Sequence, residues 1–446
     1  MSAGLIAASV RPYKIVNAAP VLALPLRVLH AWLSAPTFFF LLTLTAMLFR
    51  PPDLKAFPID RVALLLLVGC IGLRMCVQRE PVRTYGVTWP LLALTMLGLW
   101  GVVGVPYQSQ SWSLLAAKWI VPLLLFHAAS LVFTDQNSIR MLEMFCLAAL
   151  LYLSMTSIFF LLGADSLIFP RFILDAGIGI HADRARGPFL QAVANGVSLN
   201  ILGLIALDSF RRSKLPRLLA MVLFLAVPLA LLATKTRAVW LSASLSIVAV
   251  VLFGSDRRIR RAAVAFCLLG VAASVVFTVQ RFNSQEFSER LQDQSPVDFR
   301  SEIYQAGSQM FMEKPLLGWG TDANVQTEVA RRISDFHPEY YVFHNTFLEL
   351  AVGHGLLALA LYGWLILCLF RLARPAKTGS QGPPRFLDSG FRKLWPVILG
   401  VYLVNASAVV MNYQFVNGLL FTLAGIMAAQ ARREEWPTCA SERFIA

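Results

Sequence analysis

Long apolar runs alternate with short polar connections along almost the whole chain. A membrane-spanning helix needs about 20 predominantly apolar residues, because the hydrocarbon core of a bilayer is about 30 Å thick. Runs that reach or approach this length lie at residues 35–49, 60–77, 85–104, 112–133, 139–162, 188–207, 217–233, 237–253, 262–279, 344–370, 394–411 and 414–430. The pattern therefore predicts an all-α polytopic membrane protein with about 12 transmembrane helices.

The composition agrees with a membrane protein. Of the 446 residues, 57% are hydrophobic and only 14% are charged, which is far more apolar than a soluble domain. The six cysteines form no Cys-x-x-Cys pair. Neither a disulfide framework nor a zinc site is therefore predicted.

Basic residues in short connections predict the orientation of the chain, because loops rich in Lys and Arg mark the cytoplasmic side. The strongest signals are Arg-Arg-Ser-Lys at 211–214 and Arg-Arg-Ile-Arg-Arg at 257–261. We expect both termini on the cytoplasmic side. The chain then divides into a cytoplasmic or interfacial N-terminal segment (1–34), helices one to nine (35–279), a large outside loop (280–343), helices ten to twelve (344–430) and a cytoplasmic tail (431–446).

The outside loop at 280–343 is longer than an ordinary connection, which indicates a functional or lid-like element. Between residues 298 and 311 the apolar side chains recur at the spacing of one helix face, at Phe299, Ile303, Ala306 and Met310. This spacing predicts a short amphipathic helix within the loop. The Pro-Leu-Leu-Gly-Trp-Gly stretch at 315–320 is expected to terminate it.

Several cationic side chains map to the outside face in this topology. Arg186, Arg237 and Arg300 are separated along the sequence but share that face with His344, and Lys235 lies in the same short turn as Arg237. The planar guanidinium suits phosphate oxygens and remains charged at a membrane interface. Together these groups indicate a site for a diphosphate.

The neighbouring residues bear on this site in other ways. Arg184 is interpreted either as a further substrate contact or as a surface charge paired with Asp183. The outside loops contain no Asp-x-Asp pair or clustered carboxylates, so we expect neither a metal ion nor another cofactor.

His344 precedes a long apolar run, where a helix N-terminus disfavours the protonated ring. It is interpreted either as a general base for an acceptor hydroxyl or as a residue that only caps the helix. Glu349 is expected to pair with an arginine of the bundle, because its spacing from His344 does not match a helical turn. Lys118, inside another apolar run, is expected to extend to the outer interface.

The motifs together are similar to the O-antigen ligase and polymerase superfamily. They are Arg-Gly-Pro-Phe at 186–189, Thr-Lys-Thr-Arg at 234–237, Arg300 followed by the 315–320 stretch, and His-Asn-Thr-Phe-Leu-Glu at 344–349. The resemblance covers roughly residues 180 to 370. Many relatives have a serine beside the arginine where this chain has Lys235 and Thr236.

The resemblance implies a metal-independent glycosyltransferase of the GT-C type in the bacterial inner membrane, with its active site facing the periplasm. Such an enzyme transfers a glycan from undecaprenyl diphosphate, with inversion, to a hydroxyl of lipid A-core in lipopolysaccharide biosynthesis. His344, Arg237 and Arg300 would be the catalytic residues. Arg186, Lys235, Arg184 and Glu349 would bind substrate.

Three alternatives remain open at this point. An O-antigen or exopolysaccharide polymerase would use the same donor with a second carrier-linked glycan as acceptor. A protein glycosyltransferase would use a protein acceptor. A transporter of lipid-linked glycans also suits twelve spans, but transporters usually place their binding groups near the membrane midplane in two related halves. We find no convincing internal repeat.

Overall fold

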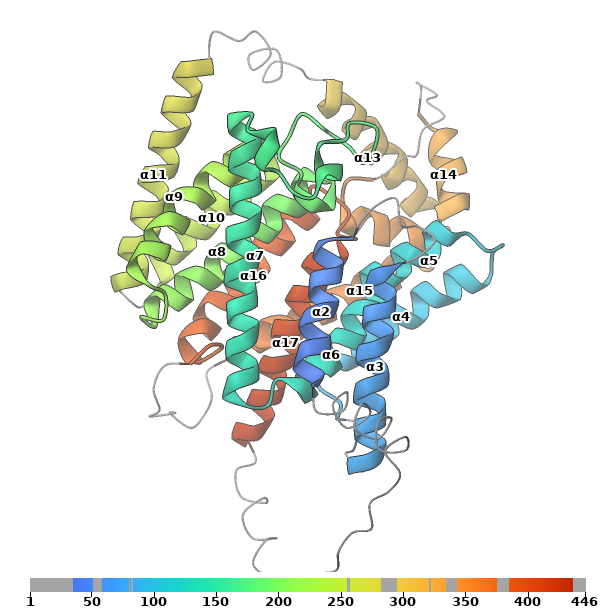
Figure 1. The fold of residues 1–446 in the computed structure, drawn as a ribbon. Helices are drawn as coiled ribbons and strands as arrows, with labels where there is room; N and C mark the ends of the chain where they lie inside the picture. Colours follow the sequence, from blue (N-terminus) through green and yellow to red (C-terminus); the bar gives the residue numbers. More distant parts are fainter. Residues whose placement is uncertain are drawn as a thin grey trace, which may run out of the picture.

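The computed structural model describes residues 35–50, 58–79, 81, 83–254, 257–281, 295–320, 322–333, 343–374 and 385–435. The predicted N-terminal segment 1–34 lies outside these residues, as do 282–294 and 334–342 of the large loop and 436–446 of the tail. Every regular element in the described residues is helical (Figure 1).

The described helices follow the apolar runs closely. Those that match the predicted spans are α2 (Pro36–Leu48), α3 (Ile59–Gln78), α4 (Thr88–Val103), α5 (Ser109–Leu115) continued by a π-turn (Ala116–Ile120) and α6 (Val121–Val132), α7 (Gln136–Leu162), α8 (Ala192–Arg211), α9 (Arg217–Ala233), α10 (Arg237–Phe253), α11 (Arg257–Arg281), α15 (Thr346–Arg371), α16 (Ser389–Ala406) and α17 (Gln414–Glu435). Each predicted run thus coincides with a helix or a nearly continuous helical segment.

Five helical segments in the described residues are long and apolar enough to cross a membrane, and four shorter apolar helices accompany them. The five segments are Ser109–Val132, Gln136–Leu162, Ala192–Arg211, Thr346–Arg371 and Gln414–Arg432. The fold is therefore that of an all-helical protein with candidate membrane spans. The number of twelve crossings and the GT-C architecture stay predictions.

Helix α17 lies in the interior of the bundle and packs closely against α6. A Cβ atom on Gly425 would lie 2.1 Å from the carbonyl oxygen of Phe126, and one on Gly418 would lie 3.0 Å from Leu125. Helices without a hydrophobic driving force between them associate through such small residues, which bring their backbones together. The glycines of α17 therefore set the distance between these two helices.

The loop between α7 and α8 lies at the same end of the bundle as α13 (Ser295–Glu313) and α14 (Asp322–Ala330) (Figure 1). We call this the upper end. The predicted amphipathic helix is confirmed as α13: Ile303, Ala306 and Met310 are buried, and Phe299 packs beside them. Their partners include Val325 of α14 and Val352 of α15. The large loop thus has its own small apolar core, which rests on α15.

Helix α15 is interrupted at Gly355, which has φ 67° and ψ −160°. Among the amino acids, this backbone region is essentially restricted to glycine. The interruption separates the carbonyls of Val352 and Gly353 from the amides of Leu356 and Leu357, which would otherwise be their partners one turn later. Four backbone groups therefore need other partners.

The 315–320 segment supplies all four. The amides of Trp319 and Gly320 donate to the carbonyls of Val352 (2.9 Å) and Gly353 (2.8 Å). The carbonyls of Pro315 and Leu316 accept from the amides of Leu356 (2.7 Å) and Leu357 (3.5 Å).

This approach leaves no room for side chains on the facing glycines. A Cβ on Gly318, which has φ 69°, would lie 2.5 Å from the Gly353 backbone, and one on Gly355 would lie 2.3 Å from the Leu316 backbone. Gly353 and Gly355 thus admit the close approach of this loop segment.

The start of α8 differs from the prediction. Residues Gly187–Phe189 form a 3-10 turn, Leu190 adopts φ 54°, and the helix begins at Ala192 rather than at Pro188. A Cβ on Gly187 would meet the Asn195 amide at 2.9 Å, so the turn packs directly on the first turn of the helix. Polar side chains at the start of this helix contact its neighbours: Gln191 donates to Tyr413, and Asn195 donates to Ser157.

Replacing Gly355 by Ala should destabilise the protein by about 2 kcal/mol or more, because the side chain would require a strained φ and would overlap the Leu316 backbone. Gly363→Ala is the matched control on the same helix, where a Cβ meets nothing within 4 Å. It should change stability by less than about 1 kcal/mol. Melting temperatures of the purified variants in detergent measure both effects, and equal shifts would contradict the role assigned to the interruption.

Candidate functional site

His344 lies at the upper end of the bundle, immediately before the cap of α15. The Asn345 side chain caps the helix by accepting the amides of Phe347 (2.9 Å) and Leu348 (3.2 Å). His344 is therefore not the capping residue. Its backbone has φ 49°, and its side chain is half-buried.

The surroundings of His344 favour the neutral ring. Burial lowers the pKa of its imidazole, and the positive charges of Arg300 and His181 lower it further. A neutral imidazole has one ring nitrogen free to accept a proton. The environment of His344 thus suits a base near neutral pH.

Helix α13 brings Arg300 towards His344. Tyr304 donates a hydrogen bond from its hydroxyl to the His344 carbonyl at 3.3 Å. Arg300 precedes Tyr304 by four residues, so the two side chains leave the same face of the helix. The Arg300 side chain is exposed. The hydrogen bond from Tyr304 to His344 therefore also brings the Arg300 guanidinium towards His344.

His181 also belongs to this group, although no motif in the sequence points to it. It lies in the loop between α7 and α8, has φ 54°, and its side chain is exposed. Its charge influences the pKa of His344 across more than 160 positions of sequence. A histidine in a polar loop without a helical or strand pattern gives no signal in a single sequence, which explains the omission.

The 234–237 turn is joined to the same loop. Lys235, with φ 47°, donates from its ammonium group to the Asp183 carbonyl at 3.0 Å. The Ala185 amide donates to the Ala233 carbonyl, also at 3.0 Å. Arg237 then begins α10 with an exposed side chain. Lys235 therefore holds the turn against the loop that carries His181. Arg237 is thereby kept at the edge of that loop.

Arg186 is engaged by the backbone of its own loop. Its side chain is 1% exposed and donates to the carbonyls of Ile173 (3.1 and 3.0 Å) and Ile178 (2.6 Å), and to that of Asp175. Burial lowers the pKa of the guanidinium, and Asp175 opposes this effect. All three nitrogens are used, so Arg186 organises the loop from within.

Arg184 lies 3.9 Å from Asp183, between the guanidinium Nε and the carboxylate Oδ2, which agrees with the surface-pair interpretation. Both groups remain partly exposed, so the pair contributes little to stability.

Glu349 pairs with Lys118, and this corrects two expectations. Glu349 was expected to pair with an arginine, and Lys118 to extend to the interface. The Lys118 ammonium instead donates to Glu349 across the bundle, with the two side chains 11% and 27% exposed. Lys118 lies in the π-turn Ala116–Ile120, a kind of helix distortion that is frequent at functional sites. The longer turn directs the lysine towards α15 instead of along the helix.

The Lys118–Glu349 pair forms part of the wall of a cavity of about 210 Å³. Phe343, the neighbour of His344, also contributes to the wall, as do Gly320 and Gly353 from the helix interruption. Further polar lining comes from Gln110, Ser111, Gln326, His354 and Asn412. A cavity with these polar side chains in its wall thus lies inside the bundle, next to Phe343.

Within the described residues, no three His, Cys, Asp or Glu side chains gather as potential metal ligands. The charged groups that lower the pKa of His344, Arg300 and His181, are basic. The electrostatic character of this region therefore suits an anionic group.

Replacing Lys118 by Met should destabilise the protein by about 1–3 kcal/mol, because Glu349 would lose its ammonium partner in a partly buried position. The double variant Lys118→Met/Glu349→Gln should lose less than the sum of the two single changes. Arg331→Met, which breaks an ion pair whose arginine is 68% exposed, is the control and should have little effect. Additive shifts in melting temperature would show that the two residues do not interact.

Comparison with known protein families gives a match for one part of the chain. Residues 219–363 match the family model Wzy_C, O-antigen ligase. The matched part contains Lys235, Arg237, Arg300, His344 and Glu349, whereas Arg184, Arg186 and Lys118 precede it. No curated protein matches the chain. Over residues 219–363 the chain is thus similar to the O-antigen ligase and polymerase superfamily, whose members are glycosyltransferase-like enzymes.

Proposed function

We propose that the protein is an O-antigen ligase of the bacterial inner membrane. It transfers a glycan from undecaprenyl diphosphate to a hydroxyl of lipid A-core at the periplasmic face. One observation carries the proposal. His344 and Arg300, which belong to the family-matched part, lie close to His181 of the loop between α7 and α8. The upper end of the bundle would then face the periplasm.

The reaction is a direct displacement at the anomeric carbon. The acceptor hydroxyl oxygen forms a bond to that carbon while the bond from the carbon to the diphosphate oxygen breaks. The hydroxyl proton moves to His344, and the electron pair of the broken bond remains on the diphosphate. Attack from the side opposite the leaving group inverts the configuration.

Arg300 and Arg237 supply the charge that this step requires. Both side chains are exposed at the upper end, where a lipid diphosphate can approach them. A guanidinium binds phosphate oxygens through two parallel hydrogen bonds and stabilises the charge that develops as the bond breaks. These groups would act in place of a divalent cation.

The other predicted substrate-binding residues have distinct roles in this proposal. Arg186 and Lys235 shape the loop and the turn, because their donors are engaged by backbone carbonyls. Arg184 lies at the exposed edge beside Asp183. Glu349 and Lys118 form a wall of the polar cavity beside His344, which is a suitable volume for part of the acceptor glycan.

A polymerase for O-antigen or exopolysaccharide is the second candidate, because the matched family is part of a superfamily that includes both enzymes. It would use the same donor and the same displacement, with a carrier-linked glycan as acceptor. The position of the cationic groups at one end of the bundle supports transfer at an interface rather than transport through the midplane.

Purified protein supplied with undecaprenyl diphosphate-linked glycan should form product only when lipid A-core is added. Chain growth without the core would instead support the polymerase, and product on an added protein acceptor would support protein glycosylation. His344→Ala should lower the rate by about 10²–10⁴-fold through loss of the base. His127→Ala is the control, since His127 contacts Thr88 outside this site and should leave transfer unchanged. Full transfer by His344→Ala would refute the proposed role.

Transfer should persist below the ordinary pKa of histidine, because the pKa of His344 is lowered and its neutral form survives to more acidic pH. Activity should fall only as the pH drops through that lowered pKa, when the ring becomes protonated. Replacing Arg300 by Met removes one of the charges that lower the pKa, so the acidic limb should move to higher pH. Profiles of rate against pH for both proteins test this prediction. An acidic limb at the same pH in both would show that it does not arise from protonation of His344.

A further inference from the structure

A cavity of about 340 Å³ lies at the opposite end of the bundle from His344. Its walls come from the start of α7, the residues that follow α8, the segment before α16 and the last turns of α17. We call this the lower end. The 27 residues of α7 separate the two ends by about 40 Å. The cavity therefore does not belong to the candidate transfer site.

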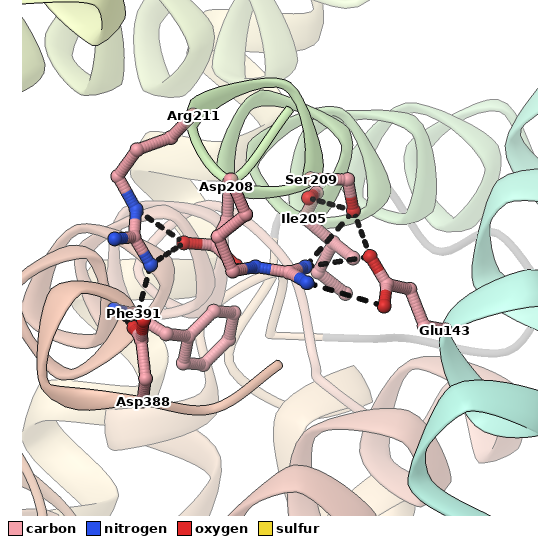
Figure 2. Close-up of polar contacts among 8 residues, drawn as sticks. Glu143, Ile205, Asp208, Ser209, Arg211, Asp388 and Phe391 are labelled. Carbon is pink, nitrogen blue, oxygen red and sulfur yellow. Dashed lines mark hydrogen bonds and ion pairs between the residues drawn. The ribbon is translucent and has the colours of Figure 1, made fainter. Parts of the chain in front are cut away.

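One wall of the cavity is a rigid ionic network that joins α7 and α8. Arg212, with a side chain 2% exposed, bonds to Glu143 (2.6 Å) and to Asp208 (2.8 Å). Asp208 in turn accepts from Arg211, which also reaches Asp388 at the cap of α16 (Figure 2). Gly390 permits this approach, because a Cβ there would lie 2.4 Å from the Arg211 guanidinium. The wall is fixed by internal pairing.

Three further cations line the cavity with exposed side chains: Arg140, Lys214 and Arg385. Among the residues that the structure describes, none of the three has an acidic side chain within ion-pair distance. The acidic groups of the lining are Glu143, which is paired with Arg212, and Asp135, which accepts the amides of Asn137 and Ser138. The lining thus retains an excess of positive charge.

Apolar side chains supply another part of the lining. Phe133, Met144 and Leu147 are among these residues, and Met144 is 58% exposed. A ligand that satisfies the whole surface carries an anionic head and an apolar body. The volume is within the range of small-molecule sites.

We propose that this cavity binds the phosphate-bearing headgroup of an anionic membrane phospholipid. The phosphate lies among Arg140, Lys214 and Arg385, and the glycerol and first acyl carbons lie against the apolar wall. Basic pockets between helices at the cytoplasmic face of membrane proteins bind lipid headgroups by this chemistry. The inference does not depend on the transfer reaction.

The test compares phosphatidylglycerol with inorganic phosphate as probes of the purified full chain in detergent. Native mass spectrometry and the shift in melting temperature on titration measure binding. The triple variant Arg140→Ala/Lys214→Ala/Arg385→Ala should bind phosphatidylglycerol at least about tenfold more weakly than the unmodified chain. The triple replacement by Gln of Arg258, Arg371 and Arg432, three exposed arginines at the same end outside the cavity, is the control and should retain the affinity.

Weaker binding of phosphatidylglycerol by the cavity variant, with unchanged binding by the control, supports the proposal. Equally weakened lipid binding by the control would show that the lipid is attracted by overall charge, and this would overturn the proposal. Equal stabilisation by inorganic phosphate at the same concentration would overturn the lipid assignment. The single variant Arg140→Gln, at an exposed position, provides the same comparison if the triple variant does not fold.

Discussion

The backbone pairing between the 315–320 segment and the interruption of α15 is the constraint on which the upper end of the molecule depends. In a membrane environment an interrupted helix is tolerated where protein or a water-filled cavity satisfies the freed backbone groups. Here two carbonyls and two amides of α15 find their partners in a single stretch of the large loop. The loop is consequently part of the bundle, and it holds α13 above the start of α15.

This attachment determines which charged groups lie near His344. Helix α13 carries Tyr304 to the His344 carbonyl, and Arg300 follows from the helical repeat. The α7–α8 loop reaches the same place because Arg186 binds its carbonyls from within and Lys235 fixes it to the next turn. One buried arginine and one lysine thus support the segments that carry the exposed arginines. The buried Arg186 donates all its hydrogen bonds to carbonyls of the loop. The side chains of Arg237 and Arg300 are exposed at the surface.

The two ends of the bundle use charge differently. At the upper end Arg300 and His181 lower the pKa of His344, and Lys118 and Glu349 line a cavity next to Phe343. At the lower end oppositely charged side chains of α7, of α8 and its C-cap, and of the N-cap of α16 neutralise one another inside the bundle. Arg140, Lys214 and Arg385 line the cavity there and have no acidic partner among the residues that the structure describes. Pairing fixes helix positions, while unpaired charge remains available to a ligand.

The sequence by itself determined the helices, because their signals are local patterns. Runs of about 20 apolar residues match the thickness of a bilayer, and the spacing of Phe299, Ile303, Ala306 and Met310 matches one buried face of a helix. It also indicated His344, Arg237 and Arg300 through their shared face and the family resemblance.

Only the tertiary structure decided the partners. The pairing of Lys118 with Glu349 depends on a π-turn, the withdrawal of Arg186 into its loop depends on three carbonyls, and the place of His181 depends on how that loop folds back. These features arise from contacts between segments distant along the chain. No periodicity within one segment encodes them, because their geometry exists only after the helices have packed.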